Sequence, residues 1–497
     1  GLKNLTIIEQ ALDIIHKTTD ETVDIEHLPL TDKSSYRLLQ TGQTTGIFQL
    51  ESAGMKRYLR ELKPTDFDDI IAMVALYRPG PMERIPDYIA GKHKKRPVTY
   101  LLPKLKPILE KTFGILVYQE QVMALVRDVA GFTPGEGYLL IKAVGKKIPQ
   151  LLDQQKQKFM DGCQRNRVDV RIAEQLWEFI EPFAHYGFNK SHSTGYALIA
   201  YQTAYLKANY PAQFMASLLT SDRDDSDRIA IEVQEARSLG IAVLPPDINE
   251  SYSTFTVVRE SLPDSPRIRF GLAAVKNVGQ NLVTAIITER KANGPFTDIE
   301  HFLQRIQHRD LNKKSLESLI MSGACTVLGD VATLLANMET LLSYNKQAQQ
   351  DKVAGQSSLF AGTTVAGPKL HLVTAQPISR RQQLDWERDL LGLYVSEHPL
   401  TKIQRLPIPE IHTLAAASQL RVNTVVKCLG LVQQLKRVFT KTGDIMQFFQ
   451  LGDATRQMEV VLFPKMLQQL KTVLADGQCV LVTGKLSKRD GEVKIIA

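Results

Sequence analysis

The sequence is poor in cysteine and has no long apolar run. Its four cysteines lie far apart and never form a Cys-x-x-Cys pair: Cys163, Cys325, Cys428 and Cys479. This usage argues against a zinc site or a disulfide framework and fits a reducing cytosol. No apolar run approaches the roughly 20 residues that a membrane span needs, and no signal peptide is recognised. We therefore expect a cytoplasmic protein without a membrane partner.

Length and charge bound the organisation of the chain. With 497 residues it is too long for one core, and roughly two to four domains are expected. The formal net charge is +8, and residues 420–497 hold twelve Lys or Arg against six Asp or Glu, an excess of +6. Most of the net positive excess therefore belongs to the last part of the chain, which is compatible with nucleic-acid binding.

The hydrophobic patterns predict a multidomain α+β protein. Residues 1–245 have helical apolar spacing, whereas short strand-like and helical runs follow from about residue 250. Residues 346–380 are rich in Gln, Ala, Gly, Ser and Thr, which is typical of a linker or mobile loop. From about residue 422, β-rich runs alternate with turns, and the stretch PKMLQQLKTVL is helix-like. This order predicts a five-stranded barrel with a helix between its third and fourth strands.

One segment is kept free of negative charge. Residues 187–211, GFNKSHSTGYALIAYQTAYLKANYP, contain no Asp or Glu, although the chain has 53 acidic residues. The Ser and Thr cluster after Lys190 is typical of a helix start, and a helix N-terminus beside a lysine favours phosphate. The ring of Tyr196 offers a flat face to a base or sugar. An ordinary capped helix with tyrosines in its core explains the same residues, so both interpretations stay open.

Two lysine-rich stretches are further candidates. KAVGKKIPQ (142–150) places Lys142, Lys146 and Lys147 around a glycine that permits close backbone approach, so the lysines can hold phosphates. A solvated basic loop is the alternative. The run GKHKKRP (91–97) favours a solvated or DNA-backbone-facing loop rather than a specific site.

A possible helix-hairpin-helix turn occurs in VKNVGQNLVTAII (275–287). Asn277 and Gly279 bracket Val278, and both residue types tolerate a positive φ. Such a turn presents backbone N–H groups to one DNA phosphate without reading bases. A plain packing unit of two helices explains the pattern equally well.

Two acidic clusters and one short peptide complete the candidates. DFDD (66–69) and DRDDSDR (222–228) offer carboxylates for Mg²⁺, but the first suits a helix start and the second a solvated loop. We predict no metal site, no nucleophile–base pair and no Walker-type loop.

GQSSLF (355–360) places Gln356, Leu359 and Phe360 in a polar segment, which is typical of a peptide that docks into a partner's groove.

Several of these stretches together resemble the α subunit of bacterial DNA polymerase III, the C-family replicative polymerase. The matching motifs, in order, are GIFQLESAGM (46–55), DIIAMVALYRPGPM (69–82), GILVYQEQVM (114–123), GFNKSHSTGYALIAYQTAYLKANYP (187–211) and LGLYVSEHPL (391–400). The motifs are long and specific, and the resemblance covers essentially the whole chain.

The resemblance implies a helical fingers domain, a clamp-binding domain that contains the helix-hairpin-helix, and a C-terminal OB-fold β-barrel. The expected ranges are 1–245 for the palm edge and fingers, 246–365 for the clamp-binding domain, 366–419 for a connector and 420–497 for the OB fold. The expected DNA contacts are Asn277, Val278, Gly279, Lys436, Arg437 and Lys441. Gln356, Leu359 and Phe360 resemble the family's internal sliding-clamp-binding peptide.

For the acid-free segment, the resemblance implies one wall of the pocket for the incoming nucleotide, where a carboxylate would repel the triphosphate. His192 is similar to the family residue that checks the sugar. The expected nucleotide-binding residues are Lys142, Lys146, Lys147, Asn189, Lys190, Ser191, His192 and Tyr196. The family usually has a paired Arg where this chain has Ile141–Lys142; the Ile cannot contact phosphate, and the Lys keeps one charge.

The function implied is template-directed DNA synthesis from deoxynucleoside triphosphates. The family holds Mg²⁺ with palm aspartates, which we expect upstream of Gly1, so we predict that this fragment binds no metal and is inactive alone. The expected partners are primed DNA template, deoxynucleoside triphosphates, the sliding clamp and other replicase subunits. Two alternatives stay open: an error-prone lesion-bypass paralogue, and a non-catalytic accessory protein built from helix-hairpin-helix and OB modules.

Overall fold

The computed structural model describes most of the chain. The described residues are 2–145, 149–184, 187–258, 265–353, 370–397, 399–400, 410–439, 443–453, 456–470, 473–489 and 492–497. The chain divides into two compact units, Gly1–Phe214 and Met215–Ala497. Each unit is described by itself.

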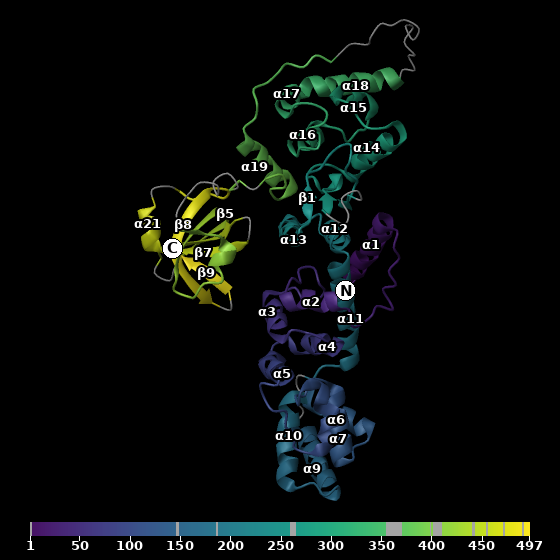
Figure 1. Ribbon diagram of the computed structural model, residues 1–497, viewed down its shortest axis with the longest axis vertical. Coiled ribbons are helices and arrows are strands. Elements are labelled where there is room, and N and C mark those ends of the chain that lie inside the picture. Colours follow the sequence, from purple (N-terminus) through teal and green to yellow (C-terminus); the bar gives the residue numbers. More distant parts are fainter. Residues whose placement is uncertain are drawn as a thin grey trace. The chain divides into compact units, whose positions relative to one another are not determined.

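The first unit is helical, as the apolar spacing of its sequence predicts (Figure 1). Its helices are α1 (Leu2–Thr19), α2 (Lys33–Thr41), α3 (Ala53–Leu62), α4 (Phe67–Leu76), α5 (Ile85–Lys92), α6 (Lys106–Leu109), α7 (Gln119–Ala130), α8 (Pro134–Gly145), α9 (Pro149–Arg165), α10 (Val170–Ala184) and α11 (Lys190–Asn209), and α12 (Pro211–Ser221) crosses the boundary between the units. Short 3₁₀ turns occupy Pro81–Arg84, Pro103–Leu105 and Glu110–Thr112.

Local sequence signals set the ends of these helices. Asp32 caps α2 by accepting a hydrogen bond from the Ser35 N–H, and α2 ends at Gly42, whose φ of 73° is costly for other residues. Asp66 begins α4 in a capping box whose second member is Asp69. Such caps satisfy N–H groups that the first helical turn leaves without partners.

Two apolar cores hold the first unit together. One joins α2, α3, α4, α5 and α11, and Tyr88 and Tyr201 are among its fully buried side chains. The other joins α6 to α10 around Phe159 and Trp177, whose ring centroids lie 5.6 Å apart. Helix α11 packs along both α4 and α2 (Figure 1). The first core therefore fixes the start of α11 relative to the N-terminal helices.

The second unit contains further helices and a small sheet. The helices are α13 (Ser226–Ser238), α14 (Gln280–Asn293), α15 (Ile299–Arg305), α16 (Lys313–Met321), α17 (Val331–Ala336), α18 (Met338–Val353), α19 (Arg380–Leu391), α20 (Leu414–Ala417) and α21 (Pro464–Gln469), with a 3₁₀ turn at Leu272–Ala274. In the sheet, β3 (Arg267–Arg269) lies between β1 (Ala242–Leu244), which is parallel to it, and β2 (Thr256–Val257), which is antiparallel.

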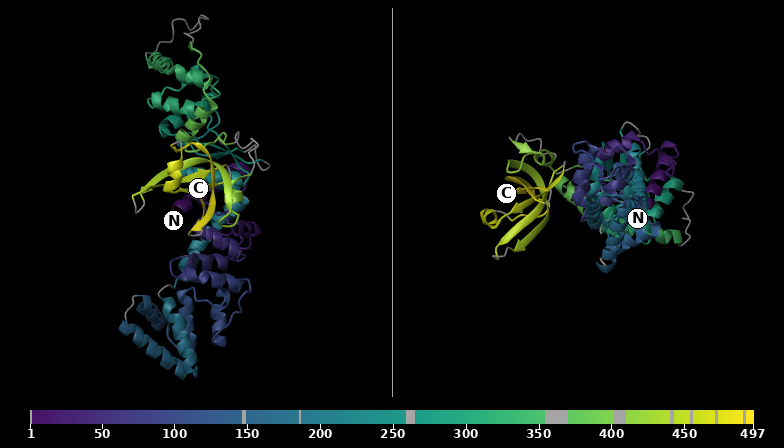
Figure 2. Two further views of the ribbon diagram at one scale, coloured as in Figure 1. Left: turned by 90° about the vertical axis from the view of Figure 1, so that its left-hand side faces the viewer. Right: turned by 90° about the horizontal axis from the view of Figure 1, so that it is seen from below.

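The C-terminal strands close into a barrel (Figure 2). The strands are β4 (Ile411–His412), β5 (Val425–Phe439), β6 (Ile445–Gly452), β7 (Gln457–Leu462), β8 (Cys479–Arg489) and β9 (Glu492–Ile496). The strands pair in the order β5–β6–β7–β9–β8, and β8 pairs again with β5 to close the barrel. The short strand β4 pairs in parallel with the first part of β5. Helix α21 lies between the third and fourth barrel strands. The predicted five-stranded barrel with one inserted helix is confirmed.

Helix α19 belongs to the packing of this barrel. Within the expected connector, 366–419, Leu384 and Tyr394 form one buried cluster with the barrel residues Leu429 and Leu431. A fragment that keeps this cluster therefore has to begin before α19. The domain boundaries expected from the sequence stay predictions.

Among the described helices, none is both long enough and apolar enough to cross a membrane.

Candidate functional site

The start of α11 is capped by Asn189, two residues before the first of its serines, Ser191. The Asn189 side chain accepts a hydrogen bond from the His192 N–H at 2.8 Å. The hydroxyl of Ser193 is fully buried and donates to the Ile71 carbonyl of α4 at 2.6 Å, so it joins two helices. Ser191 and His192 are exposed. Of the expected polar set, Asn189, Ser191 and His192 are therefore exposed at this helix end, and Lys190 is half-buried.

A carboxylate from another helix lies at this acid-free helix start. The Lys190 N–H is 3.0 Å from each carboxylate oxygen of Glu120, a residue of α7. With the Asn189 cap, two of the first three N–H groups of α11 thus have protein partners. The free N–H groups expected from the sequence are largely occupied, because the negative charge missing from 187–211 is supplied by α7.

A small cavity adjoins the same helix start. It measures about 280 Å³, and its lining includes Lys190, Glu120, Tyr118, Asp68 and Lys111. Lys111 pairs with Asp68 at 2.7 Å, and the Lys190 ammonium lies 5.4 Å from the centre of the Tyr118 ring. Burial raises the pKa of Tyr118, so its hydroxyl stays neutral. The cavity therefore combines two cations and two carboxylates beside α11.

Four aromatic rings form a row across the start of α11. The His192 ring lies between the rings of Phe188 and Tyr196, at centroid distances of 5.4 and 4.4 Å. Tyr196 in turn packs against Phe48 at 5.2 Å, and the guanidinium of Arg78 covers Phe188 at 4.2 Å. Phe188 and Tyr196 are half-buried, whereas His192 is exposed. We call this set, Arg78, Phe188, His192, Tyr196 and Phe48, the ring row.

The lysines of α8 are only partly described. Lys142 is exposed, whereas Lys146 and Lys147 lie outside the described residues. Ile141 is 8% exposed and belongs to the second core of the first unit. Its side chain therefore packs inward, in agreement with the expectation that it makes no phosphate contact.

The predicted hairpin turn has the expected backbone. Asn277 adopts a φ of 67°, Val278 is buried, and Gly279 precedes α14 without a side-chain cap. The Asn277 amide donates to the Ser318 hydroxyl at 3.1 Å, which ties the turn to α16. An uncapped helix start leaves backbone N–H groups that can meet a phosphate.

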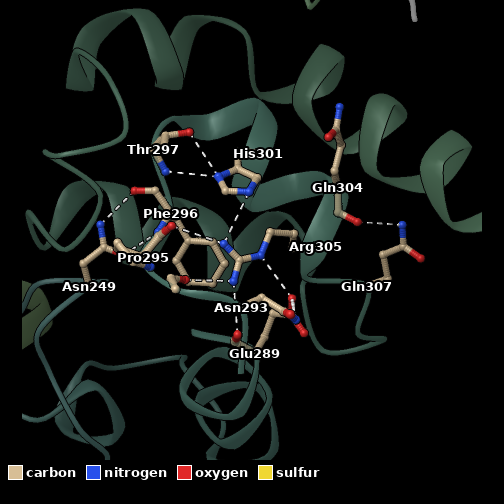
Figure 3. A network of polar contacts seen from close by, with 11 residues as sticks. Asn249, Glu289, Asn293, Pro295, Phe296, Thr297, His301, Gln304, Arg305 and Gln307 are labelled. Atoms are coloured by element: carbon tan, nitrogen blue, oxygen red, sulfur yellow. Dashed lines mark hydrogen bonds and ion pairs between the residues drawn. The ribbon is translucent and has the colours of Figure 1, made fainter. Parts of the chain in front are cut away.

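Arg305 fixes the loop that follows α14 (Figure 3). Its guanidinium pairs with the Glu289 carboxylate at 3.0 Å and donates to the carbonyls of Gly294 at 2.9 Å and Pro295 at 3.2 Å. The same guanidinium covers the Phe296 ring at 4.5 Å. This network joins α14 to α15 and so supports the helix that begins at the hairpin turn.

Two of the basic residues expected to contact DNA lie on one exposed hairpin of the barrel. Lys436 and Arg437 are exposed on β5, which pairs with β6 up to the contact of Phe439 with Ile445. Phe439 is 73% exposed. Lys441 lies outside the described residues, as do Gln356, Leu359 and Phe360 of the candidate peptide.

The acidic cluster 66–69 serves helix and ion-pair roles. Asp66 and Asp69 form the capping box of α4, and Asp69 also pairs with Lys92 at 2.6 Å, with both side chains largely buried. This cluster is a helix start, as predicted. Lys92 belongs to the run 91–97, which therefore is not uniformly solvated.

The second acidic cluster, 222–228, is predicted to be a solvated loop, and this is wrong at both ends, because Asp222 is buried and Ser226 to Arg228 belong to α13. Asp222 is 4% exposed and pairs with Arg228 at 3.2 Å, while Asp225 caps α13. Among the described residues, no three His, Cys, Asp or Glu side chains gather as metal ligands would. Caps and ion pairs engage most of the carboxylates of the two clusters.

Sequence reasoning missed Glu120, Arg78, Phe48 and Phe188 as parts of this site. All four lie in the quoted motifs, which come together in space around the start of α11. Their position in these motifs was the signal in the sequence that could have identified them as site residues.

Family models match three parts of the chain. The bacterial DNA polymerase III alpha subunit finger domain matches residues 4–167, the helix-hairpin-helix motif 240–333, and an OB-fold nucleic acid binding domain 426–497. The fold and these matches define a nucleic-acid-binding chain with a polymerase finger domain.

Similarity to known proteins extends over the whole chain. It is 40% identical to DNA polymerase III subunit alpha of Thermus aquaticus over 511 residues, covering 100% of this chain and 41% of the relative. With the corresponding subunit of Bacillus subtilis it shares 40% identity over 501 residues, covering 100% of this chain and 44% of the relative. The chain belongs to the family of bacterial DNA polymerase III alpha subunits. It spans about two fifths of the length of these curated relatives.

Proposed function

We propose that the protein carrying this chain catalyses template-directed DNA synthesis from deoxynucleoside triphosphates, with pyrophosphate as the second product. The observation that carries this proposal is the convergence of separate motifs, which bring Arg78, Tyr118, Glu120 and the 187–211 segment together at the start of α11. In this proposal the chain supplies one wall of the nucleotide pocket.

The roles follow from residue chemistry. The proposed phosphate contacts are the lysines Lys190, Lys142, Lys146 and Lys147. Their ammonium groups form charge-assisted hydrogen bonds with phosphate oxygens. His192 stands where the sugar passes, and Asn189, Ser191 and Tyr196 complete the wall. In this proposal Mg²⁺ is held by carboxylates that other parts of the enzyme supply. The chain alone is therefore expected to be inactive.

DNA contacts are proposed for the second unit. The turn Asn277–Val278–Gly279 faces a backbone phosphate of the primed template, because the start of α14 lacks a side-chain cap. Lys436, Arg437 and Lys441 are proposed to face a single strand, as on other OB folds.

Clamp docking is proposed for Gln356, Leu359 and Phe360. Leu and Phe side chains gain roughly 1.5–3 kcal/mol each when fully covered by a groove, and tethering converts such a weak contact into long residence on DNA. Replacing all three by Ala should abolish clamp-stimulated synthesis while leaving clamp-free synthesis nearly unchanged. Survival of clamp stimulation would refute this assignment. The other replicase subunits and a cytoplasmic location belong to the same proposal.

Primer extension tests the function itself. The full-length gene product should extend a primed template with deoxynucleoside triphosphates and Mg²⁺. DNA binding without any extension would instead support a non-catalytic accessory role.

A further inference from the structure

The His192 ring is held by packing rather than by hydrogen bonds. Phe188 lies four residues before it, just ahead of the helix, and Tyr196 lies four residues after it, one helical turn along α11. Within the described part of the chain, no hydrogen bond reaches either ring nitrogen of His192. An exposed side chain at a helix end would otherwise sample several rotamers.

Both neighbours of His192 are themselves anchored. The Phe188 backbone pairs with the segment before α7, since its N–H donates to the Val117 carbonyl at 3.3 Å and its carbonyl accepts from the Gln119 N–H at 2.9 Å. The Arg78 guanidinium also covers the Phe188 ring. At the far end of the ring row, Phe48 is 9% exposed and its N–H donates to the Thr203 hydroxyl at 3.3 Å.

We infer that Phe188 and Tyr196 are positioning residues that fix the His192 ring so that it can distinguish a deoxyribose from a ribose. This inference rests on the proposed function, in which His192 checks the sugar. A single hydroxyl separates the two substrates, so a side chain that excludes it has to be held to within a fraction of an ångström. The ring row provides that restraint, because the His192 ring cannot move toward Phe188 or Tyr196 without displacing that ring.

The test measures sugar discrimination, defined as kcat/KM for a deoxynucleotide divided by kcat/KM for the matching ribonucleotide, in the full-length gene product. His192→Ala should lower this ratio strongly. Tyr196→Leu and Phe188→Leu, which remove one neighbour each, should lower it about tenfold or more. Tyr196→Phe keeps the aromatic ring and should therefore show the wild-type discrimination ratio. Tyr205→Leu is the matched control, because Tyr205 is a half-buried tyrosine of α11 outside the ring row.

The double variant His192→Ala/Tyr196→Leu separates positioning from direct contact. A residue that acts through His192 has nothing left to position, so the double variant should discriminate no worse than His192→Ala. Additive losses would overturn the inference, as would unchanged ratios in both leucine variants. If Tyr196→Leu fails to fold, Phe188→Leu carries the same test from the other side. An unchanged ratio in His192→Ala would instead refute the sugar check in the proposed function.

Discussion

The backbone N–H of Lys190 is shared between the two carboxylate oxygens of Glu120, at 3.0 Å from each. This contact places a negative charge where the proposed triphosphate binds. It also satisfies a helix N–H group and complements the helix dipole. Glu120 therefore stabilises α11 while opposing an incoming anion.

Replacing Glu120 by Gln should separate these two effects. The amide oxygen can still accept from Lys190, but the charge is lost, so KM for the deoxynucleotide should fall about threefold or more. Steady-state primer extension by the full-length protein measures this change. Glu83→Gln, at an exposed glutamate of the same unit, is the control. A raised KM would show that the Glu120 charge chiefly holds α11 in its productive position.

The buried pair of Lys92 and Asp69 should be costly to break. The Asp69 side chain is 4% exposed, so Lys92→Met leaves a buried charge, which typically costs about 3–5 kcal/mol. Hydrogen exchange of the α4 amides reports the loss of local stability. Lys111→Met is the matched control, because the Lys111 side chain is 73% exposed in its pair with Asp68 and should cost at most about 1 kcal/mol. Equal effects of the two substitutions would contradict the claim that the Lys92–Asp69 pair contributes more to stability because it is buried.

The buried cysteines should be unreactive in the folded protein. Burial raises the pKa of Cys325 to about 12 and the pKa values of Cys163 and Cys428 to about 11, so very little thiolate exists near pH 8. Pulse alkylation followed by peptide mapping should label these three only after urea is added. Fast labelling of any of them in the native protein would show that its surroundings open readily.

Helices and barrel strands were predictable because their signals are local. Apolar spacing marks α1 and α7, and alternating β-rich runs separated by turns mark the barrel. The environment of Lys190 was not predictable in the same way, because Glu120 lies 70 residues away in the sequence. Likewise, the polar composition of 222–228 gives no sign that Asp222 is buried against Arg228, since burial depends on packing between elements.

The barrel should bind single-stranded DNA weakly, without sequence preference, and with strong salt dependence. Lys436 and Arg437 are exposed beside Phe439, and each phosphate contact contributes a slope of about −0.7 in log K against log salt. A fragment that begins before α19 is the suitable sample, since α19 completes the packing of Leu429 and Leu431. Lys436→Ala/Arg437→Ala should reduce the slope by about 1.4. Salt-insensitive or absent binding would leave the barrel a structural role only.

The central claim is that the start of α11 binds the triphosphate of the incoming nucleotide. The most direct measurement is the deoxynucleotide concentration dependence of single-turnover incorporation by full-length Lys190→Ala. Lys33→Ala is the matched control, because Lys33 also follows an Asx cap as the first residue of a helix. Loss of a charge-assisted contact worth about 1.5–3 kcal/mol should weaken apparent nucleotide binding roughly 10- to 150-fold in Lys190→Ala only. Wild-type nucleotide dependence in Lys190→Ala, or an equal loss in Lys33→Ala, would contradict the account.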